Sequence, residues 1–126
     1  MTRDELLKKI VSRKDEMGIT LVNISKLSNL GYRTVSRFFN GQDVKLSTVE
    51  KITNLMGLDF AGNITLDISL LRENRAKERA LYIISLVQDT SSLEKQGLKD
   101  SELNILLNET KEKFLNGEYK KNLWEV

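Results

Sequence analysis

The sequence of 126 residues contains no cysteine, no histidine and no proline, and only 6% of its residues are aromatic. Without cysteine there are no disulfides and no thiolate metal ligands. Without histidine as well, the usual zinc sites and the Ser-His or Cys-His pairs of nucleophilic catalysis are excluded. The sequence also lacks a glycine-rich phosphate loop, and its Asp/Glu pairs stand at predicted helix starts, where caps are expected. We therefore expect neither an enzyme nor a protein with a metal or another cofactor.

The absence of proline removes the strongest obstacle to long helices, and strand-like alternation is scarce. The longest apolar run, Leu81 to Val87, has seven residues and includes Ser85. A membrane-spanning helix needs about 20 such residues. The first ten residues mix acids with bases and hold no signal-peptide core. The sequence thus predicts an all-α protein with no membrane partner and a cytoplasmic location.

The net charge of +2 is distributed unevenly along the chain. Residues 1–58 contain ten Lys/Arg and six Asp/Glu, a net charge of +4, whereas residues 59–126 contain ten and twelve, a net charge of −2. Because the phosphate backbone of nucleic acids attracts positive charge, this distribution favours a nucleic-acid contact in the first half. The asymmetry is modest, so it supports that interpretation without establishing it.

Residues 20–41 predict two short helices joined by a tight turn. Thr20 is suited to cap the first helix, and Asn29 tolerates the left-handed conformation that the turn requires. Gly31 is a permissive N-cap for the second helix. In that helix Val35 and Phe38 fall three residues apart on the buried face. The outer face carries Tyr32, Arg33, Ser36 and Arg37.

This stretch resembles the helix-turn-helix of the XRE or phage-repressor family of bacterial DNA-binding proteins. The matching positions are Thr20, Ile24, Ser25, Asn29-Leu30, Thr34-Val35-Ser36-Arg37 and Asn40-Gly41, with no insertion from Thr20 to Gly41. Leu21 departs from the family, which usually has a phosphate-contacting Gln there. Phe39 replaces a common Glu, and Val44 replaces a frequent Pro. The resemblance covers approximately residues 3–58.

The resemblance implies a protein that reads bases in the major groove with the start of the second helix. Matched to the family's positions, the base-reading residues are Tyr32, Arg33, Ser36 and Arg37. The phosphate contacts are Thr20, Thr34, Asn40, Gln42 and Lys45. The alternative is an ordinary helix pair of a small bundle, which would mix both signs of charge on its solvated face. An outer face with two arginines, a tyrosine and no acid favours double-stranded DNA as the partner.

Two further helices are predicted around this pair. Residues 3–17 place Leu6, Leu7, Ile10 and Val11 inside, with Lys8, Lys9, Arg13 and Lys14 outside. After the pair, Ser47 and Glu50 form an S-x-x-E capping box for a helix that Gly57 ends. Together these elements predict an N-terminal repressor-like helix-turn-helix bundle, the DNA-binding domain, at residues 1–58.

The second half of the chain predicts a connector and two more helices. Residues 59–68 form the connector, in which 64–68 alternates apolar and polar residues and is either a short strand or an extended segment. Helices follow at about 69–88 and 99–116, with apolar stripes that a lone hairpin cannot bury. We therefore predict that residues 69–126 are a C-terminal helical region for dimerisation or partner binding. The protein is then a homodimer, and the family resemblance implies a palindromic operator.

Two functions for this C-terminal region stay open. The chain is either a stand-alone phage-type repressor whose second half only dimerises, or an autoregulating antitoxin whose second half also binds a cognate toxin. Trp124 is the candidate partner-binding residue because Trp is a typical interface anchor, although it can equally fold back onto its own core. Residues 90–94 loosely resemble the S/T-x-x-x-E inhibitory helix of antitoxins of Fic-type toxins, with Lys95 departing from that motif's Gly or Asn. Both alternatives are sequence-specific transcriptional regulators, with repression as the expected action.

Overall fold

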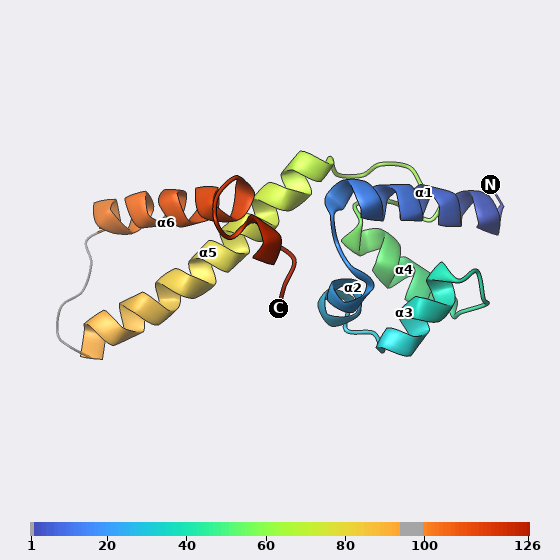
Figure 1. Cartoon of the computed structure of the whole chain (residues 1–126), viewed down its shortest axis with the longest axis horizontal. Helices are drawn as coiled ribbons and strands as arrows, with labels where there is room; N and C mark the ends of the chain where they lie inside the picture. The colour runs from blue at the N-terminus through green and yellow to red at the C-terminus, as the bar shows by residue number, and fades with distance from the viewer. Residues whose placement is uncertain (1, 94–99) are drawn as a thin grey trace. The chain divides into compact units, whose positions relative to one another are not determined.

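The computed structural model describes residues 2–93 and 100–126, and all regular secondary structure in these residues is helical. The helices are α1 (Arg3–Met17), α2 (Leu21–Ser28), α3 (Tyr32–Phe39), α4 (Leu46–Leu55), α5 (Ile68–Leu93), α6 (Asp100–Leu115) and a 3₁₀ turn at Lys120–Asn122 (Figure 1). The predicted all-α class is confirmed. Of the two alternatives for residues 64–68, the strand does not form, because Ile64 makes only an isolated bridge to Leu58.

The chain divides into two compact units. The first contains the residues up to Leu71 together with Glu125 and Val126, and the second runs from Arg72 to Trp124. In Figure 1 the helices α1 to α4 of the first unit gather into one bundle. The sequence placed a separate connector at 59–68, but this segment belongs to the first unit together with the start of α5. The reason is a set of backbone hydrogen bonds described below.

Helix α1 has the bounds that the sequence predicts. The hydroxyl of Thr2 accepts a hydrogen bond from the backbone N–H of Glu5 at 3.2 Å, and the Glu5 carboxylate accepts one from the Thr2 N–H at 3.4 Å. This reciprocal capping box satisfies two of the donors that a helix start leaves free. Gly18 ends the helix with a φ of 72°, a left-handed conformation that glycine adopts without steric cost.

The α2–turn–α3 segment also follows the sequence prediction. The Thr20 hydroxyl accepts from the Asn23 N–H at 3.2 Å, and Asn29 adopts the left-handed conformation with a φ of 57°. Buried Ser25 donates its hydroxyl to the Leu30 carbonyl at 2.6 Å, which fixes the turn. Val35 of α3 is fully buried against this frame, so the roll of α3 about its axis is set by packing.

Helix α4 differs from its prediction at the start. It begins at Leu46, with Lys45 as an N-cap that makes no side-chain hydrogen bond. The predicted capping box of Ser47 and Glu50 is therefore wrong, because Ser47 already lies inside the first turn, where its hydroxyl cannot act as the cap. The helix ends at Leu55, and Gly57 follows with a φ of 69°, as expected of a C-terminal stop.

The core of the first unit is formed by side chains from all four helices and from the α1–α2 link. Seven of its apolar side chains are almost completely buried: Ile10, Met17, Ile19, Ile24, Val35, Ile52 and Met56. Burying each such side chain contributes about 1.5–3 kcal/mol relative to leaving it in water. This core, rather than helix propensity, holds the eight-residue helices α2 and α3, which are too short to persist alone in water.

Arg13 is buried, whereas the sequence analysis placed it on the outer face of α1. Only 7% of the residue is exposed, and its Nε donates to the Met56 carbonyl at 2.9 Å. The same guanidinium also donates to the Leu66 carbonyl. Position 13 lies three residues after Ile10 and four before Met17, so it shares their face of the helix. The carbonyl at Met56, the C-cap of α4, is one of those that a helix end leaves without an intrahelical partner.

The 57–66 loop folds back onto the first unit through its own backbone. The N–H groups of Thr65 and Leu66 both donate to the Gly57 carbonyl, at 2.8 and 3.2 Å. The Asp59 carboxylate accepts from the N–H groups of Ala61 and Asn63, each at 2.9 Å. The backbone hydrogen bond from Asn63 is the main reason that the pKa of Asp59 is lowered. With its polar groups satisfied locally, the loop needs no partner strand.

A glycine pair tests how tightly this loop fits. Gly57 and Gly18 have similar φ values of 69° and 72°, but a Cβ at Gly57 would lie 3.0 Å from both Leu66 O and Leu71 Cδ1, while a Cβ at Gly18 would meet nothing within 4 Å. Gly18→Ala should therefore destabilise the unit by only the left-handed strain of about 1 kcal/mol. Gly57→Ala should cost about 2–3 kcal/mol, since crowding adds to the same strain. Urea unfolding measures both, and equal losses would contradict the crowding.

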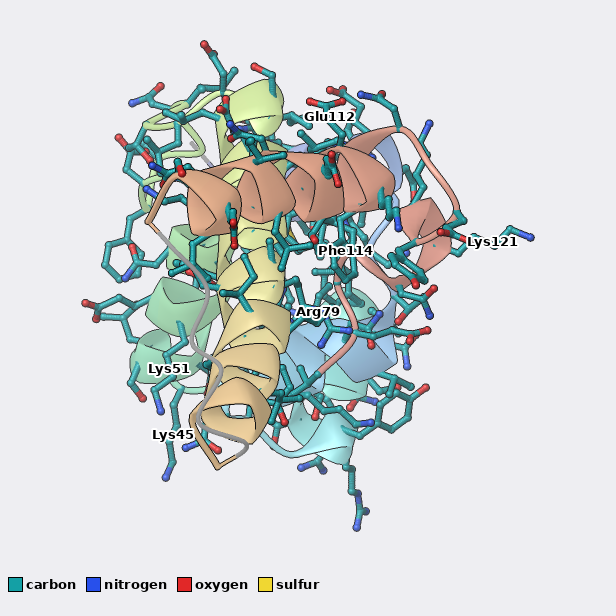
Figure 2. All side chains as sticks on the ribbon, turned by 90° about the vertical axis from the view of Figure 1, so that its left-hand side faces the viewer. Lys45, Lys51, Arg79, Glu112, Phe114 and Lys121 are labelled. Atoms are coloured by element: carbon teal, nitrogen blue, oxygen red, sulfur yellow. The ribbon has the colours of Figure 1, made fainter. Side chains whose placement is uncertain are left out.

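The second unit is held by side chains on one face of α5 that contact α6 and the C-terminal segment. Ala76 and Ala80 are fully buried, and Phe114 and Leu123 are at most 2% exposed. The Arg75 Nε donates to the Leu123 carbonyl at 3.0 Å. The guanidinium of Arg79 lies over the Phe114 ring, 5.2 Å from its centroid, and Figure 2 labels both residues. Leu81 of α5 lies outside this contact and is 47% exposed.

Among residues 2–93 and 100–126, no helix combines the length and the apolar character that crossing a bilayer requires.

Candidate nucleic-acid interface

The outer face of α3 presents the side chains that the sequence analysis assigned to base reading. Tyr32 is 52% exposed, and Arg33 and Arg37 are exposed as well, while Ser36 is half-buried. On the opposite side of the same helix, Val35 and Phe38 are buried. Successive residues of a helix are rotated by about 100° about its axis. Because Val35 and Phe38 are buried, Arg33 and Arg37 lie on the opposite, exposed side.

The electrostatics of α3 favour contact with an anion. The helix has no acidic residue, and its N-cap, Gly31, has no side chain to bind the first free N–H groups. Within the described parts of the chain, neither Arg33 nor Arg37 forms an ion pair. Two guanidinium groups and the positive end of a helix dipole thus lie on one surface without internal compensation.

The predicted phosphate contacts do not all lie together. Thr34 and Lys45 line a groove between α3 and α4, which also takes in Arg37. Asn40 is the exposed C-cap of α3, and Gln42 is exposed in the loop that follows; neither lines the groove. Thr20 is exposed at the start of α2, where its hydroxyl is occupied as the N-cap acceptor.

The groove between α3 and α4 has a volume of about 650 Å³. Its polar lining includes the cations Arg37, Lys45 and Lys51 and the hydroxyls of Thr34, Ser47 and Thr48. The sequence analysis did not assign Ser47, Thr48 or Lys51 to a site. The sequence gives only a weak indication that Thr48 and Lys51 belong together, namely that they lie three residues apart and so share one face of α4. Only the packing of α4 beside α3 places that face next to Arg37.

Trp124 is not available as an exposed partner anchor. Only 7% of the residue is accessible, so of the two alternatives left open by the sequence, its burial fits folding back onto the protein's own core. The assignment of Trp124 as a partner-binding residue is therefore corrected, because an interface anchor must offer its ring to the partner. The Fic-antitoxin-like motif at 90–94 runs into residues outside the described ranges at Glu94 and Lys95.

We compared the chain with protein-family models, with curated proteins and with solved structures, and none of them matches it. The interface is therefore judged on its own geometry and charge. A short helix with a cationic outer face, a packed inner face and a neighbouring cationic groove is chemically suited to a polyanion with a regular surface.

Proposed function

We propose that this protein is a sequence-specific DNA-binding transcriptional regulator, acting as a repressor, in which α2, the turn and α3 form a helix-turn-helix. The observation that carries the proposal is the outer face of α3, where Tyr32, Arg33 and Arg37 are exposed without any acid on the helix. Two guanidinium groups without ion-pair partners in the described residues, beside a helix start without a side-chain cap, support binding to a polyanion such as DNA.

In the proposed complex α3 enters the major groove of B-DNA, which is wide enough to admit a helix. Arg33 and Arg37 offer the guanidinium fork that binds guanine O6 and N7 bidentately. Tyr32 packs on a thymine methyl or donates to a phosphate, and Ser36 is positioned to contact either base type. The buried contacts of Val35 and the Ser25–Leu30 hydrogen bond support this geometry, since they hold α3 rigidly enough to fix the register of its side chains.

Two copies are proposed to bind together. One eight-residue helix makes few base contacts, and two copies related by a twofold axis double them on a palindromic site. The second unit has the apolar surface that such a dimer needs: Leu81, Tyr82 and Leu86 on α5 and Ile105 on α6 are each between 47% and 60% exposed. Because Trp124 is buried, the toxin-binding alternative loses the side chain that favoured it. The proposal is therefore a regulator whose second unit dimerises.

Selection of binding sites from a pool of random duplexes tests the function. We expect enrichment of a palindrome whose half-sites are centred about 10 base pairs apart, or a multiple of that, because two recognition helices on one face of DNA are separated by whole helical turns. Guanines should appear at the positions that the two arginines read. Recovery of no preferred sequence at low salt would refute sequence-specific binding.

Light scattering at micromolar protein concentration measures the assembly state independently of DNA. We expect twice the chain mass of 14.5 kDa. Replacing Leu81 and Leu86 with glutamine tests whether this surface forms the dimer. Both side chains are exposed, so the change should lower the measured mass toward that of one chain without unfolding either unit. A monomer at these concentrations, together with a non-palindromic selected site, would contradict the dimer.

A further inference from the structure

The segment that is proposed to contact DNA contains a single acidic residue. Between Glu16 and Glu50, a stretch that includes α2, the turn, α3 and the loop before α4, the only Asp or Glu is Asp43. A carboxylate at such an interface repels phosphate, and it also attracts the cations that are needed to bind DNA. The partner that holds the Asp43 carboxylate therefore affects how well the interface works.

The structure pairs this carboxylate with a cation from another helix. Asp43 forms a salt bridge with the guanidinium of Arg3, the first residue of α1, which is 40 positions away in the sequence. Figure 1 shows the start of α1 and the loop after α3 on the same side of the first unit. The two segments also pack together, because a Cβ on Gly41 would lie 3.9 Å from Leu7 Cδ2 of α1.

Asp43 shares a groove with two of the cations that are assigned to DNA. It lines the space between α3 and α4 together with Arg37, a base-reading candidate, and Lys45, a predicted phosphate contact. Neither cation forms an ion pair within residues 2–93 and 100–126. A carboxylate in one groove with two such cations is attracted to both. Because it is bound to Arg3 instead, both cations stay free for DNA.

The backbone of the loop does not fix the direction of this carboxylate. The N–H groups of Gly41 and Gln42 donate to carbonyls of α3, each at 3.0 Å. In the described part of the chain, no backbone N–H of residues 43–45 donates a hydrogen bond. The side chain of Asp43 is 95% exposed, so packing does not hold it either. The ion pair with Arg3 is the interaction that turns the carboxylate toward α1.

We propose that Arg3 is a positioning residue for DNA binding, which keeps the Asp43 carboxylate away from Arg37 and Lys45. This inference rests on the proposed function, and it gives Arg3 no contact of its own with DNA. Without Arg3 the carboxylate pairs with a cation of the groove, and DNA must displace it before that cation can bind. Exposed ion pairs shift an equilibrium by up to about fivefold, which sets the size of the effect for each bound copy.

A double-mutant cycle on the full chain tests the proposal. Arg3→Ala, Asp43→Asn and the double variant are titrated with the selected palindrome by fluorescence anisotropy. With Asp43 present, Arg3→Ala should weaken binding by about twofold to fivefold for each bound copy. Asp43→Asn alone should not weaken binding, because Arg37 and Lys45 stay free. Adding Arg3→Ala to Asp43→Asn should then change the affinity no more than Lys8→Ala does, because no carboxylate remains to compete.

Three further measurements separate the ion pair from net charge and from folding. Lys8→Ala removes one exposed charge from the same helix, and Lys8 has no ion-pair partner within the described ranges. It should change affinity by less than about twofold at 0.15 M salt, because distant charges are screened. Arg3→Lys keeps the charge and should restore most of the affinity that Arg3→Ala loses. The urea midpoint of Arg3→Ala should stay close to that of the wild type, because an exposed ion pair adds little stability.

The outcomes distinguish this inference from the proposed function. If Arg3→Ala weakens binding equally with and without Asp43→Asn, Arg3 contacts the DNA itself and the inference is overturned. If Arg3→Ala has no effect, or if Asp43→Asn alone weakens binding, the inference is overturned as well. The helix-turn-helix proposal stands in each of these cases, because the wild type still binds its site. If the wild type binds no duplex at low salt, both fail together.

Discussion

Replacing Arg33 with alanine is expected to abolish sequence-specific DNA binding while leaving the protein folded. Each bidentate contact of an arginine with guanine contributes about 1–3 kcal/mol of discrimination. A dimer loses two such contacts, a total of about 2–6 kcal/mol. The affinity for the selected site should therefore be lower by a factor of between about 30 and 10⁴. Binding to a random duplex should fall far less, because Lys45 and the other phosphate contacts remain. Fluorescence anisotropy with both duplexes measures the ratio directly.

The fold should tolerate this change, because Arg33 is exposed and has no ion-pair partner within the described residues. Surface substitutions of this kind usually change stability by less than 0.5 kcal/mol. Arg33→Lys is the sharper control, since it keeps the positive charge but loses the planar fork. We expect it to preserve the salt dependence and to lose the base preference. An unchanged preference in Arg33→Ala would remove Arg33 from the base-reading set.

Arg13→Ala is expected to cause the largest loss of stability among single changes of a charged residue in the first unit. Among residues 2–93 and 100–126, Arg13 is the only residue whose side chain donates hydrogen bonds to both the Met56 and the Leu66 carbonyls. Hydrogen bonds from charged groups contribute about 1.5–3 kcal/mol each, and a buried acceptor left unpaired carries its own penalty. We therefore expect a loss of about 3–5 kcal/mol, which is a large fraction of the stability of a small unit. Urea unfolding followed by far-UV circular dichroism measures it.

Arg13→Met separates the two contributions of this side chain. Methionine keeps most of the apolar packing but cannot donate, so it should recover only part of the stability that alanine loses. Lys8→Ala, at an exposed position of the same helix, should change little. If Arg13→Met were as stable as the wild type, the two hydrogen bonds would contribute nothing, and the 57–66 loop would be held by its own backbone alone.

Local chemistry explains why so much of the first unit was predictable. The bounds of α1, the Thr20 cap and the left-handed Asn29 follow from interactions within a few residues of each other. The placement of Val35 and Phe38 on one face of α3 follows from helical periodicity. The wrong prediction of a capping box at Ser47 and Glu50 also has a local cause. The S-x-x-E pattern does not fix the first residue of a helix to better than one or two positions, and α4 begins at Leu46, before Ser47. The exposure of Tyr32, Arg33 and Arg37 followed once the opposite face was known.

The sequence by itself determined the helical class, the α2–turn–α3 segment and the cationic outer face of α3, because helical periodicity and capping are encoded at short range. The tertiary structure decided three other features: the burial of Arg13, the burial of Trp124, and the groove that brings Lys51 and Thr48 beside Arg37. Each depends on which helices pack together, and long side chains such as arginine reach partners more than 40 positions away in the chain. Spacing along the sequence indicates which residues share a face of a helix, but not which partner that face packs against.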